Sequence, residues 1–86
     1  MNHAERAYLA LTSSNRALAS YRAGQHTVDR AAAHMMLVGE HVADVSYWSR
    51  EAVDDGQMTA EEAARIMRVA AADAADMGRM LVEVVA

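Results

Sequence analysis

The chain contains no cysteine, no proline, no phenylalanine and no lysine, and only 5% of its residues are aromatic. Without cysteine, neither a disulfide framework nor a cysteine-ligated zinc site can form. Without proline, no residue forces a break in a helix. Because extracellular domains of this size usually depend on disulfides, the composition favours a protein of the cytoplasm.

Long hydrophobic runs and an excess of positive charge are also missing. No basic start is followed by a long apolar stretch, so neither a secretory signal nor a membrane-spanning helix is predicted. The 8 basic residues are all arginine, and 12 acidic residues outnumber them, giving a net charge of −4. A negative surface repels phosphates, so nucleic acid and anionic membranes are not the expected partners.

Alanine is the residue that the chain has in abundance. Apolar residues make up 53% of the 86 positions, and 20 of them are alanine. Alanine is the best helix former, but its side chain removes little apolar area from water. We therefore expect one helical domain over residues 1–86, with close helix packing, self-association or both to compensate for a small core.

The first helix is predicted over about residues 3–22. Asn2 followed by Glu5 has the spacing of a capping box, and Gly24 is a natural C-terminal stop. The polar run Ser13–Asn15 competes for backbone hydrogen bonds, so the sequence leaves open whether this helix is broken there.

Two longer helices are predicted over about residues 28–54 and 60–84. The capping and stop signals that delimit them are Thr27 and Gly56 for the former, and Thr59 with Glu62 for the latter. No segment has the alternating pattern of a β-strand. The sequence therefore predicts an all-α fold, a three-helix bundle built on a long antiparallel helical hairpin with a less regular N-terminal helix.

Both long helices carry a heptad pattern of apolar residues in alternating steps of three and four. In the second helix the pattern comprises Val28, Ala31, Met35, Val38, Val42, Val45, Ser49 and Ala52. In the third helix it comprises Ala60, Ala63, Met67, Ala70, Ala74, Met77, Leu81 and Val84. This pattern is typical of an antiparallel coiled coil.

A specific register follows when the two heptad patterns are folded back across Gly56. Residues whose numbers sum to 112 then pack in the same layer, which places His41 close to Asp73. We predict that these two form a structural pair in which the acid favours protonated histidine. The same register gathers small residues along one edge, where a bulky side chain in place of Gly39 is expected to push the helices apart.

The segment 58–81, "MTAEEAARIMRVAAADAADMGRML", resembles the helix-turn-helix of excisionase and MerR-like regulators. The matching residues are Met58, Thr59, Glu61, Glu62, Ala63, Ala64, Ile66, Met67 and Val69. The resemblance implies a DNA-binding regulator, which stays as an alternative function. However, Arg68 occupies the turn position, "RVAAADAADM" favours a continuous helix, and its two aspartates would repel phosphates.

A metal-binding helical bundle that uses His34, His41 and Asp73 is the second alternative. The two histidines lie two helical turns apart, roughly 10.5 Å, which is too far for both to bind one ion. No serine lies on a glycine-flanked elbow, and no glycine-rich phosphate loop is present. The sequence therefore predicts no enzyme, no cofactor and no metal.

Several large apolar residues point away from the predicted hairpin, and the short first helix can cover only one side of it. The candidate interaction surface comprises Met36, Leu37, Tyr47, Trp48, Val69 and Val82, although Trp48 also suits a position at the edge of the core. Monomers seldom leave such a patch exposed. We expect a homodimer or higher oligomer that also binds a protein target, of the regulator or inhibitor type that a phage or mobile element could encode.

Overall fold

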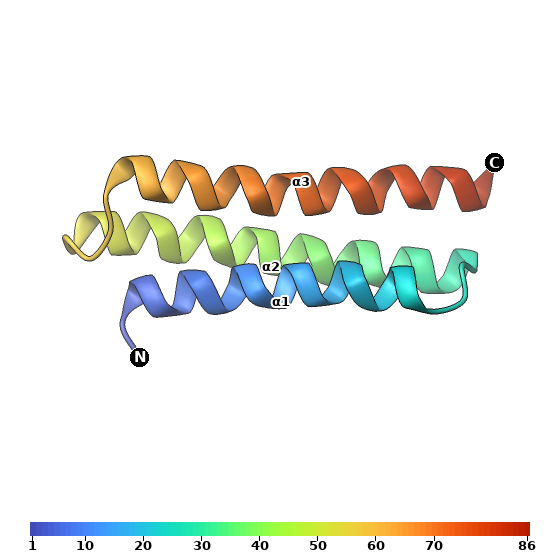
Figure 1. Cartoon of the computed structure of the whole chain (residues 1–86), viewed down its shortest axis with the longest axis horizontal. Coiled ribbons are helices and arrows are strands. Elements are labelled where there is room, and N and C mark those ends of the chain that lie inside the picture. Colours follow the sequence, from blue (N-terminus) through green and yellow to red (C-terminus); the bar gives the residue numbers. More distant parts are fainter.

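The computed structural model describes all residues, 1–86, and consists of three helices without strands. They are α1 (His3–Ala23), α2 (Val28–Asp54) and α3 (Ala60–Val85). Figure 1 shows α2 lying between α1 and α3, with the two turns at opposite ends of an elongated molecule of 44 × 21 × 15 Å. The prediction of an all-α three-helix bundle is confirmed, and α1 continues unbroken through Ser13–Asn15.

The predicted N-terminal caps are present on all three helices. At α1 the Asn2 side chain accepts from the Glu5 amide at 2.8 Å, and the Glu5 carboxylate accepts from the Asn2 amide at 3.1 Å. Thr27 and Thr59 cap α2 and α3 with their hydroxyls. Each cap satisfies a backbone N–H that has no partner within its helix.

The capping box predicted at the start of α3 is only half formed. The Thr59 hydroxyl accepts from the Glu62 amide at 3.1 Å, as expected. The Glu62 side chain, however, accepts a hydrogen bond from the Tyr8 hydroxyl of α1, and Arg65 donates to the same hydroxyl at 3.2 Å. Glu62 therefore links α3 to α1, and its side chain does not cap the N-terminus of α3.

The turn between α2 and α3 depends on Gly56. Its φ of 71° lies in the left-handed region that favours glycine. The Gly56 N–H donates to the Val53 carbonyl, and the Gln57 N–H donates to the Ala52 carbonyl. This pair of hydrogen bonds is a Schellman motif, which satisfies the last carbonyls of α2 and reverses the chain.

The same turn also holds the start of α1. The Gln57 side-chain carbonyl accepts from the backbone amides of His3 at 2.8 Å and Ala4 at 3.3 Å. The His3 Nδ1 atom lies 2.6 Å from an Asp55 carboxylate oxygen as an ion-pair contact, without the alignment of a hydrogen bond. A residue 54 positions away thus supplies part of the N-terminal cap of α1.

The interior is divided into two apolar clusters along the bundle. The cluster near the α2–α3 turn contains Ala7, Ala10, Val45, Ala52, Met58, Ala63, Ile66 and Ala70. The cluster near the α1–α2 turn contains Ala17, Leu18, Tyr21, Ala31, Val38 and Met77. Half of these residues are alanine, which lets the three helices approach closely.

The buried side of α3 is rotated from the predicted heptad pattern. Ile66 and Asp73 are buried, whereas Met67 is exposed. The reason is that α1 packs over the side of the hairpin that carries Ile66 and Asp73. The heptad pattern considered two helices alone, and the third helix extends the buried surface toward itself.

The predicted pairing of His41 with Asp73 is wrong. Asp73 is buried and accepts a hydrogen bond from the Ser14 hydroxyl of α1 at 2.8 Å. No ion pair or hydrogen bond joins it to His41, which lines a groove between α1 and α2. A buried carboxylate needs a donor, and α1 supplies it.

Two other buried hydroxyls have no hydrogen-bond partner. They belong to Ser49 in α2 and Tyr21 in α1, and both residues are completely buried. Ser49 was the only polar residue of the predicted heptad pattern. Burying a hydroxyl without a partner destabilises the folded state, so Ser49 lowers the stability of the fold. Ser14 raises it, because its hydroxyl is bonded to Asp73.

The contrast between the two serines gives a paired prediction. Ser14→Ala should lower the free energy of unfolding by about 1–3 kcal/mol because Asp73 loses its donor. Ser49→Ala should raise it by about 1 kcal/mol because an unbonded hydroxyl is removed. Chemical denaturation measures both values. Serine-to-alanine exchange in a helix has the same propensity term in each variant, so shifts of the same sign and size would contradict the assignment.

The hydrogen bond between Tyr8 and Glu62 leads to a second prediction, which concerns the pKa of Tyr8. The hydrogen bond to Glu62, followed by burial, raises the pKa of Tyr8 above its usual value of 10.0, and Arg65 partly opposes this. Glu62→Gln should bring that pKa down, whereas Glu61→Gln, which alters a neighbouring exposed carboxylate, should not. Ultraviolet titration of phenolate absorbance measures the shift.

The raised pKa of Tyr8 also determines how the free energy of unfolding changes with pH. A raised folded-state pKa favours the protonated phenol in the folded protein. The stabilisation is therefore complete below the usual tyrosine range and is lost as the pH rises through the folded-state pKa of Tyr8. Equal pH dependence of unfolding in the wild type and Tyr8→Phe above neutrality would contradict it.

Candidate protein-interaction face

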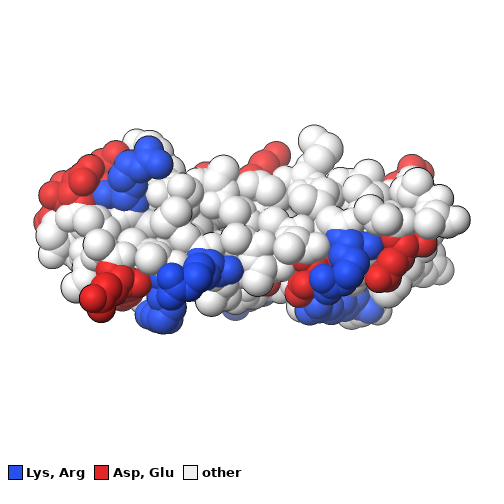
Figure 2. Space-filling view, turned by 90° about the horizontal axis from the view of Figure 1, so that it is seen from above, with Lys and Arg blue, Asp and Glu red and all other residues white.

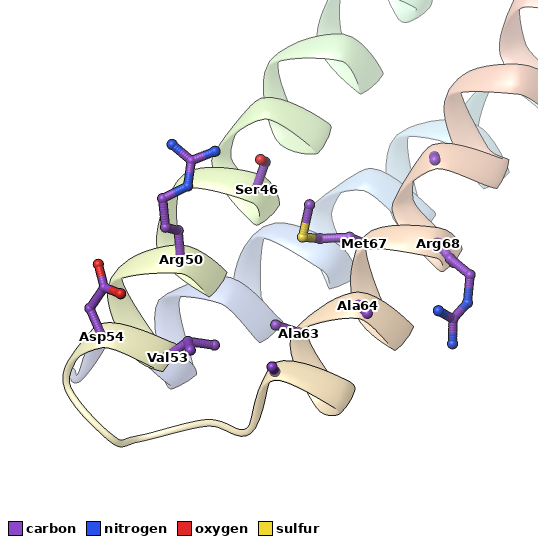
Figure 3. Close-up of a pocket in the computed structure, with 10 residues that line it drawn as sticks. Ser46, Arg50, Val53, Asp54, Ala63, Ala64, Met67 and Arg68 are labelled. Atoms are coloured by element: carbon purple, nitrogen blue, oxygen red, sulfur yellow. The ribbon is translucent and has the colours of Figure 1, made fainter.

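α1 covers one side of the α2–α3 hairpin and leaves the opposite side open. We call this open side the α2–α3 face. Near the turn it is hollowed into a groove of about 550 Å³ between α2 and α3 (Figure 3). The groove is lined by Ser46, Arg50, Val53, Asp54, Ala60, Ala63, Ala64, Met67, Arg68 and Ala71.

The groove has an apolar floor and charged rims. In Figure 3, Met67 reaches from α3 toward Ser46 on α2, while Arg50 stands at the α2 rim and Arg68 extends outward from α3. Neither arginine takes part in an ion pair, since the pairs of the structure are His3–Asp55, Arg22–Asp76 and Arg79–Asp76. Both guanidinium groups are therefore available to a partner.

The open face continues along the hairpin beyond the groove. Positions seven apart lie on the same side of a helix, so Gly39 and Ala32 follow Ser46 along α2. On α3, Gly78 follows Ala71 in the same way, and a Cβ atom built on Gly78 would lie 3.9 Å from the Met35 sulfur. The small-residue edge predicted from the sequence is present on this face.

One expectation for that edge is wrong. A Cβ atom built on Gly39 would have no atom within 4 Å. The glycine therefore faces open space in the single chain, and a larger side chain would not push α2 away from α3. The physical reason is that the small edge lies at the outer surface of the hairpin and not in its packed seam.

Charge is sparse along the middle of this region. Figure 2, which looks down on α3, shows acidic and basic side chains mainly toward the two ends of the molecule, with mostly uncharged atoms between them. On α2 the outward positions from Met36 to Tyr47 on this side are apolar or small, apart from Glu40 at the far margin. The α2–α3 face is thus apolar at its centre and charged at its ends.

Five of the six residues predicted to form an interaction surface are exposed. Met36 is 70% exposed, Val82 66% and Tyr47 55%, and both Leu37 and Val69 are also exposed. They do not form one patch, however. At about 100° per residue, Leu37 and Val69 lie on the sides of α2 and α3 that turn toward α1, whereas the other three border the α2–α3 face.

Trp48, the sixth predicted residue, is half-buried against α1. Its ring centroid lies 5.3 Å from that of His3, and the Arg6 guanidinium lies 4.7 Å above it. Tyr47 packs edge-on against it at 4.8 Å. Trp48 thus packs into the junction of α1 and α2 as part of the bundle, and the rest of its surface lines the groove between these two helices.

The geometry does not fit the two alternatives predicted from the sequence, a helix-turn-helix and a metal site. α3 runs without interruption from Ala60 to Val85, so the segment 58–81 lacks the two-helix shape of a helix-turn-helix. The three candidate metal ligands are separated and do not form one site. His34 Nδ1 contacts the Arg30 carbonyl at 2.8 Å, His41 lines the α1–α2 groove, and Asp73 is bound to Ser14.

No helix is long and apolar enough to span a bilayer. Comparison with family models, curated proteins and solved structures gives no match for this chain. The open α2–α3 face is therefore the feature on which a functional argument can rest.

Proposed function

We propose that this protein is a non-enzymatic helical protein that acts by binding another protein through its α2–α3 face. The observation that carries the proposal is the uncovered apolar groove lined by alanine, valine and methionine, with Met36, Tyr47 and Val82 exposed elsewhere on the same two helices. Apolar patches of this kind on small proteins mark interaction sites. A regulator or inhibitor would work in this way, by occupying a surface of its target.

The shape of the face favours a helix as the bound element. A groove between two nearly parallel helices accepts an amphipathic helix, whose apolar residues enter at positions i, i+3, i+4 and i+7. The small side chains of Ser46, Ala64 and Ala71 permit close approach, and the flexible Met67 adapts to what lies above it. Arg50 and Arg68 at the rims favour acidic residues on the flanks of the bound helix.

The proposal predicts where contacts with partners occur. A photo-crosslinking amino acid placed at Met67 or Val82 should capture a bound protein, whereas the same group at Ala19, on the exposed side of α1, should not. Ala71→Glu should reduce capture at least tenfold, because a carboxylate in the groove is desolvated on binding. Ala19→Glu is the matched control, and circular dichroism verifies that both variants remain helical.

Mass spectrometry of the captured species gives the readout. Capture from Met67 that survives Ala71→Glu, or equal capture from Ala19, would contradict binding through this face. The absence of capture from every position on the face, for copies of this chain as well as for other proteins, would overturn the proposed function.

A further inference from the structure

We infer that the α2–α3 face binds a second copy of this chain, with the two α2 helices packed antiparallel about a twofold axis close to Gly39. This inference rests on the proposed function, because it names the partner of the same face. It commits to an isologous dimer, in which each copy presents the same surface to the other.

A strip of small residues runs along the open side of α2. Ala32, Gly39 and Ser46 are spaced by seven residues and lie on one side of the helix. With Gly39 on the axis, residues whose numbers sum to 78 lie opposite each other, so Ala32 faces Ser46 of the second copy. Only small side chains meet along this line, and nothing within the chain fills the space outside Gly39.

Charged residues near the two ends of α2 also favour the antiparallel arrangement. Asp29 lies ten residues before Gly39 and Arg50 eleven residues after it, roughly 15 and 16 Å from the axis at 1.5 Å per residue. Neither has an ion-pair partner within the chain. An antiparallel arrangement brings Asp29 of one copy to the level of Arg50 of the other, and it does so twice. A parallel arrangement would place like charges together, so charge favours the antiparallel one.

Two of the exposed apolar residues of α2 flank the strip that contains Gly39. At about 100° per residue, Met36 lies roughly 60° and Tyr47 roughly 80° around the helix from Gly39, on the side away from α3. In the antiparallel pair, Met36 therefore lies near the level of Ala43 of the second copy, and Tyr47 near the level of Ala32.

These contacts would cover part of Met36 and Tyr47, which are 70% and 55% exposed in the single chain. Because the axis repeats every contact, each of these residues is covered in both copies. Burial of such side chains is the main driving force for association. The chain's alanine-rich interior leaves several large apolar residues exposed in the single copy, where a dimer can bury them.

The absence of cysteine makes the register directly testable. Gly39→Cys should form a disulfide-linked dimer of twice 9.3 kDa on mild oxidation at micromolar concentration, because residues at the axis approach within the Cα separation that a disulfide needs. Ala19→Cys, on the exposed side of α1, is the matched control. We expect at least tenfold less crosslinked product from it.

Orientation is tested by mixing two variants. Ala32→Cys and Ser46→Cys should crosslink to each other in a mixture and much less to themselves, since antiparallel packing places the two positions opposite each other. A parallel dimer would give the reverse, with each variant crosslinking to itself.

A steric variant tests the interface without an introduced thiol. Gly39→Leu finds open space within the single chain, so helicity should be retained while light scattering changes from dimer to monomer. Ala19→Leu should remain dimeric. Retention of the dimer in Gly39→Leu would contradict a close α2–α2 contact.

The outcomes separate this inference from the proposed function. A wild-type chain that is monomeric at high concentration, or a dimer that fails to crosslink through Gly39, would overturn the inference. Capture of a different protein from Met67 in that case would leave the proposed function standing. A dimer with the Ala32–Ser46 crosslink supports both.

Discussion

The hydrogen bond between Ser14 and Asp73 fixes how the three helices are arranged around one another. Asp73 lies among apolar residues, where a carboxylate without a donor would strongly destabilise the fold. The donor comes from α1, so α1 has to lie on the side of the hairpin that carries Asp73. That placement buries Ile66, leaves Met67 at the surface and leaves the α2–α3 face open.

The small core explains why so much apolar surface remains outside. Alanine accounts for much of both interior clusters, and it permits close helix contact while removing little area from water. Polar contacts at the exposed surface add to this packing, although each such ion pair contributes little to stability. Arg22 of α1 pairs with Asp76 of α3 at 3.2 Å, and Arg79 holds the same carboxylate at 2.8 Å, which lowers the pKa of Asp76.

The features that were predictable from the sequence are local ones. Capping residues such as Asn2 and Thr59 act on amides three positions away, and Gly56 acts within its own turn, so spacing alone locates the helix ends. The heptad pattern likewise identifies the hairpin and its small edge. These signals extend over a few residues, and each can be recognised without knowing what lies across the bundle.

The features that were missed involve residues far apart in the chain. Ser14 and Asp73 are 59 positions apart, and the hairpin register alone placed His41 nearest to Asp73 because it took no account of α1. An aspartate on an otherwise apolar flank was a signal that a donor was needed. A serine within the polar run of α1 was a candidate donor, but no local pattern joined the two. Of the two roles that the sequence left open for Trp48, core edge or interface, the structure places it at the edge of the bundle against α1, a helix that the hairpin pattern does not include.

The bond between Gln57 and the first turn of α1 also determines when that helix can be completed. Most of the stability of a helix in a protein comes from tertiary contacts, and two of the initial amides of α1 find their acceptor only in the α2–α3 turn. The beginning of α1 is therefore fully capped only when the α2–α3 turn is in place. Capping of α1 is thus coupled to formation of the hairpin across 54 positions of the chain, so a change in the α2–α3 turn is felt at the first turn of α1.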